Sequence, residues 1–414
     1  MLTTKITRRS LLATGAAAAA SSIPTAWAIA QPKPVKVGLM LPYSGTFAQL
    51  GENITYAIEM YFAEKGGKLG GREIQLVKLD DESKPELGLQ NADRLIKRDN
   101  VDVLIGTVHS GVQMAIHKAV TESGTLCIVP NAGAVAVTRN LCAKNVFRTS
   151  FSNWQPAYGM GVVMGKRGVK KAAWVTWDYA AGAESGEGFK QGLEANGGQV
   201  VQTLTLKFPE TNFQPLLAQI PGLGVDAVGS FFAGGGAINF VKDYAAAGLK
   251  VPLVGSGFLT EGVLGPQGAA AEGVETALHY GDGIDNPKNN AFRAAFKAKA
   301  NREADVYAVQ GYDAAQLLGI GLEAVKGNME NEAGLYKAMR EAKIDSPRGP
   351  ISFSKSQEIV QNIYVRKVER KNGQLVNTTI DEVKDVSQFF TYDPKQFLAG
   401  PLYGRDVPPA KNLE

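Results

Sequence analysis

Residues 101–133, VDVLIGTVHSGVQMAIHKAVTESGTLCIVPNAG, carry the pattern that decides the fold. The apolar run 101–106 predicts a buried strand, and residues 111–123 predict a helix that leads into a second buried strand at 126–129. Two strands joined by a helical crossover run parallel in one sheet. This stretch therefore predicts a parallel sheet with helices covering its faces.

The same alternation continues on both sides of this stretch. A restart near Gly168 predicts a second sheet of the same kind, so we expect an α/β fold with two doubly wound parallel sheets. A polar hairpin at 362–369 and 374–379 brackets Asn372-Gly373, which is typical of a type I′ turn. Further strands are predicted at 35–41, 74–79, 146–149, 172–177, 200–206, 227–232, 253–255 and 274–280, and helices around 54–62, 87–98, 187–195, 237–247, 289–300 and 312–324.

The composition excludes several classes of protein. The 414 residues include 44% hydrophobic side chains, 44 Lys and Arg against 40 Asp and Glu, and only two cysteines. Such a chain can bury a large core in roughly two domains, so it is not a disordered tail. A disulfide-dense module needs more cysteine and a nucleic-acid-binding protein shows clustered basic residues, so we expect neither, and no nucleic acid as a partner.

The N-terminus has the features of an export signal. Arg8 and Arg9 precede an alanine-rich run at residues 11–20, and Ala28-Ile29-Ala30 is a small-x-small cleavage site. We predict a twin-arginine signal peptide over residues 1–30, cleavage after Ala30 and a periplasmic mature protein. A structural N-terminal helix is the alternative, but it would show an amphipathic stripe. No later stretch has the roughly 18 to 20 apolar residues of a membrane helix, so we expect the mature chain to be soluble.

The residues that an enzyme needs are scarcely represented. His109, His117 and His279 lack the spacing of metal ligands, and no P-loop or nucleophile-elbow motif occurs. Three glycines at residues 234–236 follow a predicted strand, but the later glycine and the acid of a dinucleotide site are missing. We therefore predict no metal, no cofactor and no enzymatic activity, and keep an exported enzyme as an alternative.

The two cysteines, Cys127 and Cys142, lie at the starts of two consecutive predicted strands. In an oxidising compartment this arrangement permits a disulfide. Cys127 also lies inside an apolar run, as expected for a small buried hydrophobic residue. The sequence leaves both states open.

Two loops at the carboxyl ends of neighbouring strands predict an anion site, because ligands bind at this edge of open α/β sheets. The first loop opens a helix and presents a serine hydroxyl and free backbone amides at its positive end. The second loop offers further amides on small residues that a ligand can approach closely. Ordinary loop chemistry is the alternative for each loop. The residues are His109, Ser110 and Gly111 in the first loop and Asn131, Gly133 and Ala134 in the second.

Several motifs together resemble the periplasmic solute-binding proteins of branched-chain-amino-acid-type ABC importers, over nearly the whole mature chain. These motifs are LPYSG at 41–45, LG at 50–51, GGKLGGR at 66–72, DD at 80–81 and GYDA at 311–314. The resemblance implies a type I periplasmic binding fold: two Rossmann-like lobes joined by three crossovers, closing over a ligand. It also implies a membrane permease as partner and a monomeric protein.

The resemblance further divides the chain into lobes. It places the crossovers near residues 149–152, 280 and 351–354. We accordingly predict residues 31–150 with 281–354 as the first lobe and residues 151–280 with 355–414 as the second.

The same resemblance assigns roles to some residues. The serine that anchors the ligand carboxylate in the family matches Ser110, its second anchoring loop matches residues 131–133, and a pocket aromatic matches Tyr307. The acid that holds the ligand ammonium in leucine/isoleucine/valine-binding proteins is replaced by Gly257, followed by Phe258. The other departures are Leu50 and Ala181 in place of pocket tyrosines, and Phe232-Ala233 in place of a glycine-tyrosine pair.

These departures favour a ligand with a carboxylate and no amine, because an ammonium buried without an acid is strongly disfavoured. Aromatic residues in the expected pocket loops would stack on a flat ligand, although core packing is the alternative for any one of them. We therefore predict an aromatic monocarboxylate of the benzoate or hydroxycinnamate kind. Binding of branched-chain or other aliphatic amino acids stays open, as does a ligand-sensing role. The expected pocket aromatics are Phe47, His109, Trp154, Tyr179, Phe232, Phe258 and Tyr307.

Overall fold

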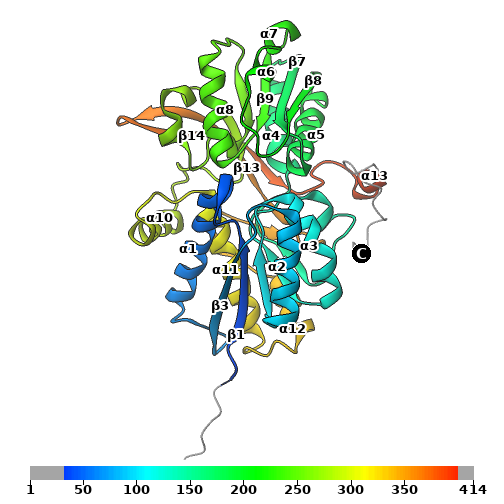
Figure 1. Ribbon diagram of the computed structural model, residues 1–414, viewed down its shortest axis with the longest axis vertical. Coiled ribbons are helices and arrows are strands. Elements are labelled where there is room, and N and C mark those ends of the chain that lie inside the picture. Colours follow the sequence, from blue (N-terminus) through cyan, green and yellow to red (C-terminus); the bar gives the residue numbers. More distant parts are fainter. Residues whose placement is uncertain (1–31, 400–414) are drawn as a thin grey trace, which may run out of the picture. The chain divides into compact units, whose positions relative to one another are not determined.

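The computed structural model describes residues 32–399, drawn in colour in Figure 1. The predicted signal peptide, residues 1–30 with cleavage after Ala30, lies outside the described residues. Within the described part of the chain, no helix is long and apolar enough to cross a membrane.

The first sheet has the strand order β2-β3-β1-β4-β5-β6. All neighbouring pairs are parallel except β2 and β3. Helices α1 and α11 pack on each other, as do α2 and α3. Its strands are β1 Val35–Leu41, β2 Lys68–Leu69, β3 Arg72–Asp80, β4 Val103–Gly106, β5 Leu126–Val129 and β6 Val146–Arg148. The helices around it are α1 Ala48–Glu64, α2 Pro85–Asp93, α3 Ser110–Ser123, α10 Pro287–Ala300, α11 Val306–Ala324 and α12 Glu332–Arg340.

The second sheet has the order β12-β13-β11-β10-β9-β7-β8, with β14 paired to β13. Its strands are β7 Lys171–Trp177, β8 Gln199–Leu206, β9 Ala227–Phe231, β10 Leu253–Ser256, β11 Glu275–Leu278, β12 Ser352–Phe353, β13 Ile359–Lys371 and β14 Gln374–Val386. The helices that accompany the second sheet are α4 Trp154–Lys166, α5 Ala180–Glu194, α6 Gln214–Leu217, α7 Ile220–Leu223, α8 Gly234–Ala246, α9 Leu264–Gln267 and α13 Pro394–Ala399.

The predicted α/β architecture with two sheets is confirmed, with one correction. The sequence predicts two parallel sheets and a hairpin, whereas β13 of that hairpin also joins the second sheet, where it pairs antiparallel with β11 and β12, and β2 pairs antiparallel with β3 in the first sheet. The predicted hairpin forms between β13 and β14, and Asn372 and Gly373 both have positive φ angles, 50° and 80°, as a type I′ turn requires. The antiparallel strands arise because the chain returns to the second sheet after α12 and then turns back on itself.

Helix α4 was not predicted from the sequence. All its residues from Trp154 to Gly165 are buried, so the helix has no polar face and shows no amphipathic period. It packs against α5 and against strands β10, β11 and β13. A helix that is buried on every side leaves no alternating signal for sequence analysis to detect.

We call the first sheet with its helices the first half and the second sheet with its helices the second half. Three segments connect the two halves: residues 149–153, 279–286 and 341–351. Buried arginines hold two of them. Arg348 forms an ion pair with Asp313 at 3.1 Å and donates to the carbonyl of Ser150 at 3.1 Å, and Arg148 pairs with Glu358. The residue bounds predicted for the two lobes stay a prediction.

The structure contains no disulfide between Cys127 and Cys142, a bond that the sequence left open. Cys127 lies in the core beneath α2 and α3, and burial raises the pKa of its thiol to about 12. Cys142 lies outside that core and lines a surface groove beside Lys144 and Arg340. The two thiols are therefore held in different environments.

Candidate functional site

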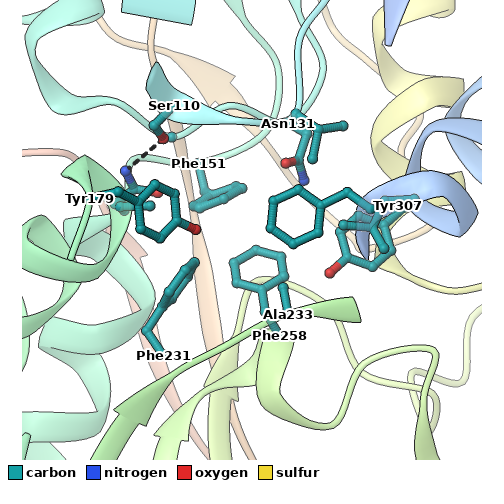
Figure 2. Close-up of a pocket in the computed structure, with 14 residues that line it drawn as sticks. Ser110, Asn131, Phe151, Tyr179, Phe231, Ala233, Phe258 and Tyr307 are labelled. Atoms are coloured by element: carbon teal, nitrogen blue, oxygen red, sulfur yellow. Dashed lines mark hydrogen bonds between the residues drawn. The ribbon is translucent and has the colours of Figure 1, made fainter. Parts of the chain in front are cut away.

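A small cavity, with about 20 Å³ of space for the centre of a water-sized sphere, is lined by residues from both halves (Figure 2). Most lining residues follow the carboxyl ends of β1, β4, β5, β6, β7, β9 and β10, the usual ligand position in open α/β sheets. They are Phe47, Leu50, Val108, Ser110, Asn131, Gly133, Phe151, Asn153, Tyr179, Ala181, Phe231, Ala233, Phe258 and Tyr307.

The N-terminal ends of three helices meet at this cavity. Ser110 is the first residue of α3, Tyr179 is the N-cap of α5, and Ala233 is the N-cap of α8. Each helix has at least 13 residues, and each N-terminus carries a partial positive charge. The cavity is therefore electrostatically suited to an anion although none of its lining side chains is cationic.

Ser110 has a hydroxyl hydrogen available to a ligand. Its Oγ accepts a hydrogen bond from Asn153 Nδ2 at 3.1 Å, shown as a dashed line in Figure 2. Within residues 32–399, its hydroxyl donates to no group. Because a serine hydroxyl has one hydrogen and two lone pairs, the hydrogen remains free to bind a carboxylate.

Asn131 is held in place by a chain of hydrogen bonds. Its Nδ2 donates to Gln310 Oε1 at 2.7 Å, and Gln310 Nε2 lies 3.0 Å from His279 Nε2. Burial lowers the pKa of His279 well below its usual value, so its ring is neutral. The ring of Phe151 stacks on His279, with centroids 5.1 Å apart. This chain therefore fixes both an amide and an aromatic ring of the cavity wall.

Aromatic rings form most of the wall. Phe258 lies 4.7 Å from Phe151, 5.9 Å from Phe231 and 5.9 Å from Tyr307, measured between ring centroids. Tyr179 lies 6.2 Å from Phe231. Figure 2 shows these rings surrounding the open centre of the cavity. Aromatic pairs at these separations attract one another, and a flat aromatic ligand can join the same cluster.

The hydroxyl of Tyr307 is buried without a hydrogen-bond partner among the described residues. Tyr307 is 1% exposed and lines the cavity from the first turn of α11. Burial raises the pKa of its phenol well above 10, so the hydroxyl keeps its proton. An unsatisfied buried hydroxyl is costly, and a polar group on a ligand would satisfy it.

No Asp, Glu, Lys or Arg occurs among the described residues that line the cavity. Gly257, where the family acid was expected, cannot be replaced by a larger residue without displacement, because a Cβ there would overlap Leu278 and Arg366. Arg366 in turn pairs with Glu261 at 2.5 Å. A ligand ammonium would therefore find no carboxylate in the wall.

His109 does not line the cavity, contrary to the prediction. It is the N-cap of α3, and its Nδ1 accepts from the backbone N–H groups of Gly111 at 3.1 Å and Val112 at 3.4 Å. Its ring stacks on Tyr179 at 4.9 Å. Burial lowers the pKa of His109 to about 4, so it is neutral near pH 7. His109 therefore supports the wall from behind and supplies no positive charge.

Trp154 and Phe232 also lie outside the cavity lining. Trp154 stacks on Tyr158 at 4.1 Å, and its Nε1 donates to Gln191 at 2.8 Å. Phe232 packs against Phe240 at 4.5 Å, whereas Phe231 lines the cavity. Successive residues of a strand point to opposite faces, so only one of the two phenylalanines can reach the site.

Gly111 and Ala134, predicted as backbone donors, have other roles. The N–H of Gly111 is committed to His109, and neither residue lines the cavity. The carbonyl of Ala134 accepts from Arg148 Nη1 at 2.6 Å. Of the residues predicted for the site, the structure brings together Phe47, Ser110, Asn131, Gly133, Tyr179, Phe258 and Tyr307, and their binding role stays a prediction.

The sequence prediction omitted four notable wall residues. Phe151 and Asn153 follow β6, so the rule that sites lie at the carboxyl ends of strands could have found them. The alternation of β9 could have selected Phe231. Val108 carries no polar or aromatic signal and could not have been chosen.

Comparison with a family model shows similarity over most of the chain. Residues 34–374 match the periplasmic binding protein family. The Leu/Ile/Val-binding protein homolog 6 of Brucella melitensis biotype 1 is 32% identical over 345 residues, which cover 81% of this chain and 88% of that protein.

Solved structures show the same architecture. A solute-binding protein of an ABC transporter from R. palustris, in complex with benzoate, is 50% identical, covers 85% of this chain and 98% of its own, and superposes with a TM-score of 0.81. A second R. palustris solute-binding protein, in complex with 4-hydroxybenzoate, is 30% identical over 86% of this chain and 98% of its own, with a TM-score of 0.81. A third, from Rhodopseudomonas palustris BisB5 with 3,4-dihydroxybenzoic acid, is 32% identical with the same coverages and TM-score.

Proposed function

Because this chain belongs to the periplasmic binding protein family and is an ABC transporter solute-binding protein, we propose that it captures an aromatic monocarboxylate of the benzoate type. The family is non-enzymatic, so the site binds its ligand without converting it. The observation that carries the proposal is the cavity itself. Aromatic rings enclose it, one hydroxyl donor lies at a helix N-terminus, and no charged side chain lines it among the described residues.

The charge distribution favours a monocarboxylate over an amino acid. The ligand carboxylate would receive the Ser110 hydroxyl hydrogen and lie at the N-terminus of α3. An amino acid would also bring an ammonium into a wall without a carboxylate, and burying an unpaired charge costs several kcal/mol. Gly257 cannot supply the missing acid, since even a Cβ is too large there.

The solved relatives support this ligand class. The structure at 50% identity contains benzoate, and two others at 30% and 32% contain hydroxylated benzoates. The curated relatives are named for Leu, Ile and Val, at 32% identity and below among those compared. The charge-free aromatic wall of this chain accords with the first group.

We propose capture by closure of the two lobes over the ligand. The carboxylate anchor Ser110 belongs to the first half, whereas Tyr179, Phe231 and Phe258 belong to the second. A ligand that touches both halves stabilises the closed form by binding it more tightly than the open form. Gln49 Nε2 donates to the carbonyl of Gly262 at 3.3 Å and adds a direct contact between the halves. The membrane permease of the importer would recognise this closed form in the periplasm.

Calorimetry with purified protein tests the proposal. Benzoate and 4-hydroxybenzoate should bind with a dissociation constant well below that of leucine or isoleucine. Each should also raise the melting temperature, because a ligand that binds only the folded state stabilises it by mass action. Tight leucine binding together with no response to either benzoate would overturn it.

A further inference from the structure

Glu184 lies outside the cavity lining but is bonded to both halves of the chain. Its Oε2 accepts from Asn153 Nδ2 at 2.7 Å and from the backbone N–H of Val135 at 3.1 Å. Val135 follows β5 of the first sheet, and Glu184 lies in α5 beside the second sheet. One carboxylate oxygen therefore connects the two halves directly behind the proposed carboxylate anchor.

Asn153 continues this connection to the anchor. The same Nδ2 that donates to Glu184 also donates to Ser110 Oγ at 3.1 Å, and an amide nitrogen has two hydrogens for these two bonds. Gly133 passes so close to the Asn153 Oδ1 that a Cβ at Gly133 would overlap it. The Asn153 amide is thereby held in the orientation that points its hydrogens at Glu184 and Ser110.

We propose that Glu184 is a positioning residue for ligand capture, which acts through Asn153 to keep the Ser110 hydroxyl as a donor toward the cavity. The inference rests on the proposed function, since it assumes a carboxylate ligand at Ser110. With Asn153 donating to its oxygen, Ser110 can only accept at that position, and its hydrogen is left for the ligand. The bond to Val135 completes this arrangement when the two halves are together.

The surroundings of Glu184 make this positioning dependent on pH. The charged groups that act on Glu184 from the first-sheet side are Arg139 and Arg148, and Arg148 is itself paired with Glu358. From its own helix, the titratable group nearby is Tyr179 at the start of α5. Burial outweighs these cations and the two hydrogen bonds, and it raises the pKa of Glu184 to about 7.

A bound anion should raise the pKa of Glu184 further, because like charges disfavour the ionised form. Ligand binding is then accompanied by proton uptake, and by linkage the affinity is higher where Glu184 is protonated. The affinity should therefore fall as the pH rises from 6 to 8. Over this range the carboxylate ligand itself stays ionised.

The test is calorimetry with benzoate at pH 6 and pH 8 on the full mature chain and three variants. Glu184→Gln keeps the acceptor oxygen without the titratable proton, and Glu184→Ala removes the acceptor. Glu194→Gln, at the exposed end of the same helix, is the matched control. Melting temperatures without ligand report whether each variant folds.

Wild type and Glu194→Gln should lose several-fold in affinity between pH 6 and pH 8, by at most tenfold per pH unit for a single proton. Glu184→Gln should lose this pH dependence and retain an affinity near the wild-type value at pH 6. Glu184→Ala should bind on the order of tenfold more weakly than wild type does at pH 6, the size of one hydrogen bond to a charged group, and its affinity should not change between pH 6 and pH 8 because the titratable group is gone.

Two results would overturn the inference while leaving the proposed function intact. One is a wild-type affinity for benzoate that does not change with pH, and the other is a Glu184→Gln pH profile equal to that of wild type. The Gln variant decides the matter even where Glu184→Ala does not fold. Absence of benzoate binding by wild type at both pH values would instead contradict the proposed function.

Discussion

Replacement of Ser110 by alanine tests the proposed anchor most directly. The variant removes the one side-chain hydroxyl of the first turn of α3 that faces the cavity and leaves the N-cap, His109, unchanged. The helix should therefore stay intact, and its N-terminal partial charge should persist. The loss should fall on ligand binding.

The magnitude follows from the hydrogen bonds at the site. A hydrogen bond to a charged group contributes roughly 1.5–3 kcal/mol, which corresponds to about 10- to 150-fold in Kd. Asn153 Nδ2, which donates to Ser110 Oγ at 3.1 Å in the wild type, also lines the cavity. In the variant, the hydrogen that this amide donates to Ser110 in the wild type is free for the ligand, so we expect a loss at the lower end of the range.

Isothermal titration with benzoate measures the effect, and thermal unfolding without ligand measures stability. Ser123→Ala, at the opposite end of α3, is the matched control, because the Ser123 hydroxyl donates only to local groups. Ser110→Ala with an affinity within twofold of wild type would refute Ser110 as the anchor. A drop in melting temperature much larger than that of Ser123→Ala would show a structural role instead.

Three further predictions follow from particular contacts. Tyr307→Phe removes an unsatisfied buried hydroxyl, so it should raise the free energy of unfolding by about 1 kcal/mol. It should also weaken the binding of 4-hydroxybenzoate more than that of benzoate, and equal changes in the two affinities, measured by calorimetry, would argue against contact between Tyr307 and a ring hydroxyl. Gly257→Ala should lower the free energy of unfolding, measured in urea, by about 1–3 kcal/mol, because the added Cβ would overlap Leu278. Unchanged stability would show that Leu278 and Arg366 can move to make room for it. Burial lowers the pKa of His109 from 6.5 to about 4, so between these pH values the unfolded state binds the proton first, and the free energy of unfolding falls by about 3 kcal/mol from this group as the pH decreases. His109→Asn keeps a capping acceptor and should show a shallower decline of the free energy of unfolding with decreasing pH, whereas an identical decline would assign the loss to other groups.

Much of the fold could be read from local patterns. The β-branched runs and the helical stretches between them predicted β1, β3, β4, β5 and β6 of the first sheet within a few residues, whereas the two-residue strand β2 was missed. Strands β1, β4 and β5 are almost completely buried, which is why their apolar runs are so clear. Helix α4 escaped detection since both its faces are buried. The antiparallel partners of β13 depend on pairing between distant segments, which no local period reports.

The candidate site was predicted only in outline. Ser110 and Asn131 lie where the carboxyl ends of parallel strands must place them. Phe231 replaced Phe232 because the strand ends one residue earlier than expected and its alternation decides which ring faces the cavity. Trp154 was assigned to the pocket for its residue type, but its ring stacks on Tyr158, with centroids 4.1 Å apart, and lies outside the cavity lining.

The sequence by itself determined the alternation of strands and helices, the lack of catalytic motifs and the position of the loops with the proposed anchor, because these depend on residue type and on spacing along the chain. Only the tertiary structure decided which side chains meet. Glu184, Asn153 and Ser110 lie on three different segments, and their shared hydrogen bonds exist only once α3, α4 and α5 are brought together. The absence of charge from the described cavity wall is likewise a property of packing, because Arg148 is paired with Glu358 and Arg366 with Glu261 instead of facing the ligand.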